Sequence, residues 1–150
     1  MVDPKIKSWK SYLFVIVQIV SLGLITISGP LFSENKWLLF VEMMGLGLGI
    51  WSIIIIRPGN FNITPDPLSW SKLVKVGPYR TIRHPMYLAL LLTTLPLIIT
   101  SFSIFRLSIW MMLLLDLVLK IKYEETLLLE AVDGYENYLN ESYKIIPFVY

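Results

Sequence analysis

The sequence of 150 residues contains no cysteine and only one histidine, His84. Without cysteine the chain can form no disulfide, no thiolate nucleophile and no cysteine-ligated metal site. A single histidine argues against a catalytic zinc centre. A strict G-x-G-x-x-G motif is also missing, and the glycines at positions 45, 47 and 49 lie within an apolar run. A Rossmann-type cofactor site is therefore not supported, and close helix packing is the preferred interpretation of these glycines.

Charge is scarce as well, at 16% of residues against 55% hydrophobic ones, and the mean hydropathy is +0.65. Such a chain is too apolar for a soluble domain of this size. Residues 12–32 and 37–56 each form a run of about 20 apolar residues, the length that crosses a bilayer core. Residues 86–121 are too long for one span. We therefore predict a single all-α integral membrane domain, 1–150, with about four spans, at 12–32, 37–56, 86–102 and 104–121. The last two spans would form a helical hairpin.

The basic residues predict the orientation of these spans. Only Lys36 and Arg106 fall in the opposite loops, whereas every other lysine and arginine precedes the first span, lies between the second and third, or lies at or beyond the end of the fourth. By the positive-inside rule, both termini, the loop 57–85 and the tail 122–150 are cytoplasmic. A basic membrane rim explains the pI of 8.8 without a nucleic-acid partner. The lack of cysteine and the short loops favour a prokaryotic plasma membrane.

Two segments outside the spans have a distinctive composition. The loop 57–85 combines turn residues with apolar side chains, and we expect it to fold as a lid. Its Pro58-Gly59 pair is typical of a turn. Residues 120–132 should continue the fourth span as an amphipathic helix that ends at Asp133-Gly134. The tyrosines after it are interpreted as an interfacial aromatic tail.

Residues 77–87, Gly-Pro-Tyr-Arg-Thr-Ile-Arg-His-Pro-Met-Tyr, join the loop to the third apolar run. Pro85 pushes His84 out of the α conformation and is well suited to open the next helix. Arg83 and His84 would then precede a helix N-terminus, which favours an anionic ligand group. Taken singly, His84 could be an interfacial cap and Arg83 an orientation charge. Together with the acidic helix described next, they favour a binding site.

Asp116, Lys120 and Glu124 are spaced i, i+4, i+8 and share one helix face. For Asp116 the preferred interpretation is an ion pair with Lys120, whose side chain snorkels to the membrane edge. Glu124 falls on the stripe that faces the protein, so it needs a cationic partner such as Arg80, Arg83, His84 or a ligand ammonium. Solvation beside its acidic neighbour is the alternative.

Two ordered motifs resemble those of a known family. Residues 73–87 read Leu-Val-x-x-Gly-Pro-Tyr-Arg-x-x-Arg-His-Pro-x-Tyr, and about 40 residues later a basic residue precedes Glu124 by four positions. Over roughly 60–147 this resembles the isoprenylcysteine carboxyl methyltransferases and, more loosely, the phospholipid N-methyltransferases. The resemblance implies a membrane enzyme that transfers a methyl group from S-adenosylmethionine to a lipidic or prenylated acceptor, without a metal.

The resemblance also implies residue roles. The cofactor pocket would be lined by Thr64, Lys72, Leu73, Val74, Tyr79, His84 and Glu124. Charge complementarity, separately from the resemblance, suggests that the Arg83-His84 helix entry binds the cofactor's carboxylate and Glu124 its ammonium. Lys120 stands where the family usually has a substrate-binding arginine, and we expect it to be the catalytic residue that attracts the acceptor. Because lysine is a point charge and lacks the guanidinium fork, the acceptor stays open among carboxylates, amines and other amphiphiles.

Two other functions are compatible with the sequence. Sterol reductases resemble this methyltransferase architecture, so a membrane reductase that uses NADPH is the second enzymatic hypothesis. A small helical protein that binds lipid headgroups or a partner through its basic face is the non-enzymatic one.

Overall fold

The computed structural model describes residues 8–60, 64–66 and 73–147, with the side chains of 57–60 excepted. The described elements are the helices α1 (Trp9–Ile27), α2 (Lys36–Asn60), α3 (Pro85–Thr100), α4 (Ile104–Ala131) and α5 (Tyr135–Glu141), and the 3₁₀ turn η1 (Gly77–Arg80). Within these residues there is no strand, only an isolated parallel bridge between Ile82 and Tyr143. The all-helical prediction is confirmed.

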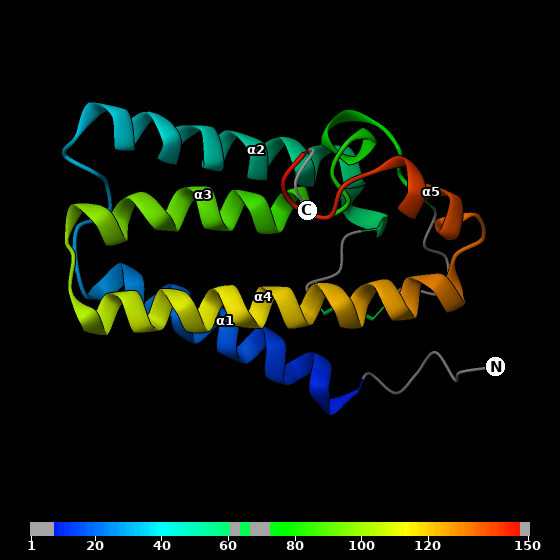
Figure 1. Ribbon diagram of the computed structural model, residues 1–150, viewed down its shortest axis with the longest axis horizontal. Helices are drawn as coiled ribbons and strands as arrows, with labels where there is room; N and C mark the ends of the chain where they lie inside the picture. The colour runs from blue at the N-terminus through cyan, green and yellow to red at the C-terminus, as the bar shows by residue number, and fades with distance from the viewer. Residues whose placement is uncertain (1–7, 61–63, 67–72, 148–150) are drawn as a thin grey trace.

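The four long helices alternate in direction (Figure 1). The turns that join α1 to α2 and α3 to α4 lie at one end of the molecule. The start of α3, the end of α4, the helix α5 and the C-terminal segment lie at the other end, which we call the site end. Helix α1 packs on α4, and α2 packs on α3. Residues from the middle of the sequence and from its C-terminal part therefore meet at the site end.

Two helices, α1 and the Lys36–Ile56 part of α2, are long and apolar enough to cross a membrane by length and composition. Helix α3 is apolar but has only 16 residues. Helix α4 carries three charged residues along its apolar part, Arg106, Asp116 and Lys120. Large apolar side chains are exposed on the outer faces of all four long helices, as lipid-facing surfaces require. The prediction of four spans itself stays a prediction.

Several predicted boundaries change. Helix α2 continues to Asn60, so the turn predicted at Pro58-Gly59 is wrong. Helix α4 is one continuous helix of 28 residues, and Gly134, with φ of +78°, follows its end, as predicted. The expected aromatic tail is instead helix α5, which buries Tyr135 and Tyr138. Residues 61–63 and 67–72 of the expected lid lie outside the described residues.

Close packing fixes α3 against α2. Helix α3 begins at the site end, so this packing also positions the residues there. A Cβ on Gly45 would lie 2.6 Å from the Thr93 hydroxyl oxygen and 2.7 Å from the Thr93 backbone nitrogen. At Gly49 the nearest atom is the Ala89 Cβ at 3.4 Å, whereas Gly47 faces open space. The packing interpretation is therefore confirmed at Gly45, where the two helix backbones touch.

The end opposite the site is held together by Arg106, which is only 2% exposed. Its guanidinium donates to the Ile25 carbonyl at 3.0 Å, the Ser28 hydroxyl at 2.9 Å and the Leu97 carbonyl at 2.9 Å. These acceptors lie at the C-terminal ends of α1 and α3, where helix carbonyls can accept further hydrogen bonds; the Leu97 carbonyl also accepts from Ser101 N–H. Arg106 was predicted to lie in a loop. It is instead a buried residue of α4 whose hydrogen bonds join this helix to the ends of α1 and α3.

Candidate functional site

The site is built where η1 leads into α3. His84 has φ of −121° and ψ of 58°, outside the α conformation, and Pro85 is the first residue of α3, as predicted. The chain before it is held by the C-terminal segment: Arg83 N donates to the Tyr143 carbonyl at 2.8 Å and His84 N to the Lys144 carbonyl at 3.0 Å. Residues about 60 positions apart thus fix the start of α3.

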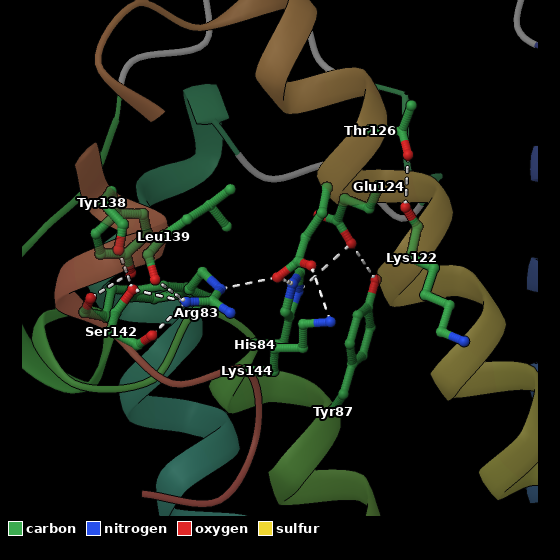
Figure 2. Close-up of polar contacts among 12 residues, drawn as sticks. Arg83, His84, Tyr87, Lys122, Glu124, Thr126, Tyr138, Leu139, Ser142 and Lys144 are labelled. Carbon is green, nitrogen blue, oxygen red and sulfur yellow. Dashed lines mark hydrogen bonds and ion pairs between the residues drawn. The ribbon is translucent and has the colours of Figure 1, made fainter. Parts of the chain in front are cut away.

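Arg83 connects α4 to the C-terminal segment. Its Nε donates to Glu125 Oε1 at 2.8 Å, and both side chains are almost buried, at 6% and 11% exposure. Its Nη1 donates to the Leu139 carbonyl at 3.0 Å and to the carbonyl and hydroxyl oxygens of Ser142 (Figure 2). A guanidinium can satisfy several acceptors at once because its five N–H groups are fixed in a plane. Arg83 therefore joins three segments of the chain.

Glu125 is the most strongly paired carboxylate of the site end. Besides Arg83, the Lys144 ammonium lies 3.5 Å from its Oε2 and His84 Nε2 lies 3.5 Å from its Oε1. Burial alone would raise the pKa of this carboxyl, but the neighbouring His84 and Arg83 side chains outweigh burial and lower the pKa from 4.5 to about 2. The folded protein thus keeps Glu125 ionised.

This depressed pKa predicts acid sensitivity. The stabilisation is fully present above pH 4.5 and is lost as the pH falls towards 2, because the unfolded chain binds the proton more readily. The shift corresponds to about 3 kcal/mol at about 1.4 kcal/mol per pKa unit. Unfolding midpoints of the detergent-solubilised protein should fall over this range. The Glu125→Gln variant should lack this component, and an equal fall in both proteins would contradict the assignment.

Glu124, the neighbour of Glu125, occupies a different environment. Its Oε2 accepts a hydrogen bond from the Tyr87 hydroxyl at 2.8 Å and lies 3.7 Å from His84 Nδ1. The His84 and Tyr87 rings stack, with centroids 5.4 Å apart. The Glu124 side chain stays 25% exposed. It is positioned by two aromatic side chains and still accessible to a ligand.

Lys120 lies one helical turn before Glu124 and is only 2% exposed. Its ammonium donates to Gln18 Oε1 of α1 at 2.8 Å and lies 5.2 Å from the centroid of the Tyr87 ring. The expected snorkelling is therefore wrong, because this side chain points into the bundle. Tyr87 contacts Lys120 with its ring and Glu124 with its hydroxyl, and so connects the two predicted halves of the site.

Two polar atoms near Glu124 can still form hydrogen bonds with a ligand. The Tyr79 hydroxyl is buried without a hydrogen-bond partner among the described residues, and His84 Nε2 has there only its 3.5 Å ion-pair contact with Glu125 Oε1. Burial, and next the charge of Glu124, raise the pKa of Tyr79 above its usual range, so its hydroxyl stays protonated and able to donate. A carboxylate with a free edge beside polar groups that can still form hydrogen bonds suits a ligand that carries an ammonium and acceptor atoms. The amino-acid end of S-adenosylmethionine fits that description.

The structure brings together five of the predicted residues, Tyr79, Arg83, His84, Lys120 and Glu124. Thr64, Leu73 and Val74 are half-buried in the connection between α2 and η1. Lys72 lies outside the described residues. Arg80, considered as a partner for Glu124, is exposed, and no contact in the described part of the chain joins the two.

Sequence reasoning missed three residues of this cluster. Glu125 was interpreted together with Glu124 as a solvated acidic pair, because the sequence does not show which cations approach each carboxylate. Tyr87 belonged to the motif but received no role. Gln18 is the only glutamine in the chain and stands within an apolar run. A polar side chain inside a span is costly and usually functional, and that signal could have identified it.

The chain was compared with known proteins. Residues 31–130 match the model of the isoprenylcysteine carboxyl methyltransferase (ICMT) family. No curated protein and no solved structure matches the chain. The matched region covers two thirds of the sequence and includes α2, η1, α3 and most of α4, and thus Arg83, Lys120 and Glu124. The chain belongs to the isoprenylcysteine carboxyl methyltransferase family, a family of membrane methyltransferases.

Proposed function

We propose that this protein transfers a methyl group from S-adenosylmethionine to a lipidic or prenylated acceptor at the cytoplasmic face of a membrane, as one domain of four spans. The observation that carries the proposal is the arrangement around Tyr87, with the accessible Glu124 at its hydroxyl and the Lys120 ammonium against its ring. Two reactants in such a pair of neighbouring sites would be close together, which is the main requirement for group transfer.

The cofactor half of the proposed site is centred on Glu124. Its exposed carboxylate edge would accept the cofactor's ammonium, while the Tyr79 hydroxyl, which has no hydrogen-bond partner among the described residues, and the His84 ring lie beside it. The guanidinium of Arg83 already binds Glu125 and the C-terminal segment, so we propose that it acts on this pocket by fixing its walls. By family resemblance, Thr64, Lys72, Leu73 and Val74 would complete the pocket.

The protein's own side chains would contribute by positioning the two reactants. S-adenosylmethionine, when bound, supplies an electrophilic methyl group on a sulfonium, and the acceptor's lone pair displaces the thioether. Lys120 would attract an anionic part of the acceptor from within the bundle. The aromatic ring of Tyr87 would form a wall between the two reactants. Burial of these groups excludes water and strengthens their electrostatic interactions.

The proposed orientation in the membrane rests on where the basic residues lie. The site end contains Arg83, Lys120 and Lys144, whereas Lys36 and Arg106 lie in the first turns of α2 and α4, which begin at the opposite end (Figure 1). Under the positive-inside rule the site end is cytoplasmic. The exposed apolar faces of α1 and α2 would contact lipid, and an acceptor dissolved in the bilayer would approach Lys120 sideways.

Calorimetric titration of the purified wild-type protein in detergent tests the proposal. S-adenosylmethionine should bind and compete with its thioether product, whereas NADPH should give no saturable heat. Binding of NADPH without binding of S-adenosylmethionine would support the reductase alternative and contradict the proposal. Binding of neither would leave the non-enzymatic alternative.

A further inference from the structure

Gln18 lies in the middle of α1 between apolar neighbours, and its side chain reaches α4. The amide oxygen of Gln18 accepts a hydrogen bond from Lys120 Nζ at 2.8 Å. A polar side chain within a membrane span is costly, so it calls for a reason beyond packing. Helix α1 ends before residue 31, where the family match begins, so the family match assigns no role to Gln18.

Packing on both sides of Gln18 fixes the register of α1 on α4. Towards the start of α1, the Phe14 and Tyr123 rings are in contact, with centroids 5.8 Å apart. Towards its end, Ile25 belongs to the same buried core cluster as Leu113 and Leu117 of α4. Closely packed contacts of this kind leave little freedom to shift. The amide of Gln18 is therefore held at a constant height opposite Lys120.

Lys120 is also attracted along its own helix. Glu124 and Asp116 lie four residues to either side of it on α4, the spacing at which opposite charges on a helix can meet. Glu124 attracts the ammonium more strongly than Asp116 does. Since Lys120 is only 2% exposed, little water screens this attraction. The direct contacts of the Glu124 carboxylate among the described residues are nevertheless with Tyr87 and His84.

We propose that Gln18 is a positioning residue that holds the Lys120 ammonium away from Glu124, and so keeps the Glu124 carboxylate available for the ammonium of the cofactor. The Gln18 amide binds the Lys120 ammonium from α1, and the Tyr87 ring, 5.2 Å away, contacts it from α3. A neutral amide oxygen satisfies an ammonium without adding a charge to the site. This inference rests on the proposed function, because it takes Glu124 as the group that binds the cofactor.

Loss of the Gln18 amide would make Lys120 a competitor of the cofactor. The lysine side chain has a flexible four-carbon stem, so its ammonium could turn along α4 towards Glu124. S-adenosylmethionine would then bind only those molecules in which this ion pair is open, and its apparent affinity would fall by that fraction. An ion pair formed in about nine molecules out of ten lowers the affinity roughly 10-fold.

Calorimetric titration of S-adenosylmethionine into the detergent-solubilised protein tests this inference. Gln18→Leu removes the amide and should lower the affinity roughly 10-fold. Lys120→Met removes the competing ammonium and should not lower the affinity. The double variant Gln18→Leu/Lys120→Met should therefore recover the wild-type affinity, because a residue that acts only through Lys120 has no effect once Lys120 is absent.

Two further variants complete the design. Gln18→Glu, whose carboxylate also accepts from the Lys120 ammonium, should keep the affinity close to the wild-type value. Thr26→Val on α1, where the hydroxyl donates to the Leu22 carbonyl of its own helix, is the matched control and should change nothing. Unfolding midpoints show whether each variant is folded. Gln18→Met, which keeps the length of the side chain without the amide, replaces Gln18→Leu if the latter does not fold.

The outcomes separate this inference from the proposed function. Wild-type affinity in folded Gln18→Leu would overturn the inference. A loss that persists in the double variant would overturn it too, because Gln18 would then act on the fold and not through Lys120. If S-adenosylmethionine does not bind the wild-type protein, or binds Glu124→Gln with unchanged affinity, the proposed function itself is contradicted.

Discussion

Replacing Arg83 by methionine is expected to destabilise the protein by about 3–5 kcal/mol, the usual loss when one partner of a buried ion pair is removed. Methionine is of similar length but leaves Glu125 without its 2.8 Å partner and three oxygens of the C-terminal segment without a donor. The measurement is the unfolding midpoint in detergent. Because the same segment holds the start of α3, affinity for S-adenosylmethionine should fall as well.

The matched control is Arg80→Met, which removes the same charge from an exposed position three residues earlier. It should leave both the midpoint and ligand affinity close to the wild-type values. In the Arg83→Met background, Glu125→Gln should restore part of the lost stability, because it removes the charge left without its main partner. Equal midpoints for Arg83→Met and Arg80→Met would show that the buried ion pair is not important for folding.

Glu124→Gln is expected to have the largest effect on ligand binding, a roughly 10- to 100-fold loss of affinity for S-adenosylmethionine. The substitution keeps an oxygen that can accept from the Tyr87 hydroxyl but removes the negative charge that would bind the cofactor's ammonium. The fold should therefore be retained, and a calorimetric titration reports the affinity directly.

Glu130→Gln is the control for this substitution, since residue 130 is exposed on the same helix. It should bind S-adenosylmethionine as the wild-type protein does. If Glu124→Gln keeps wild-type affinity and an unchanged unfolding midpoint, the cofactor half of the site has been placed wrongly, and the pairing of Glu124 with Tyr87 would be purely structural.

Local chemistry determined what the sequence could predict well. Pro85 specified both the start of α3 and the non-helical His84, and Gly134 marked the end of α4. Apolar run lengths gave the number and order of the long helices. Glu124 was separated from the solvated residues by its position on the helix stripe, and the structure does join it to His84 and Tyr87.

What could not be predicted depends on contacts between distant segments. The helix α5 buries two tyrosines beneath the site, and Arg83 reaches it across 56 residues of sequence. Glu125 differs from Glu124 only through Arg83 and Lys144, which approach from other segments. Gln18 reaches Lys120 from 102 residues away. A motif search within the region matched by the family model would also pass over Gln18, since the match begins at residue 31.

The unbroken course of α4 has one more consequence. Because Asp116, Lys120 and Glu124 are spaced four residues apart on a continuous helix, successive side chains lie about 6 Å apart along its axis, at about 1.5 Å per residue. The spacing along α4 therefore fixes the relative depth of these side chains in the bundle. An acceptor bound at Lys120, as proposed, would be held about one turn deeper than a cofactor bound at Glu124, so the length of its headgroup would decide whether the reacting atom reaches the methyl group.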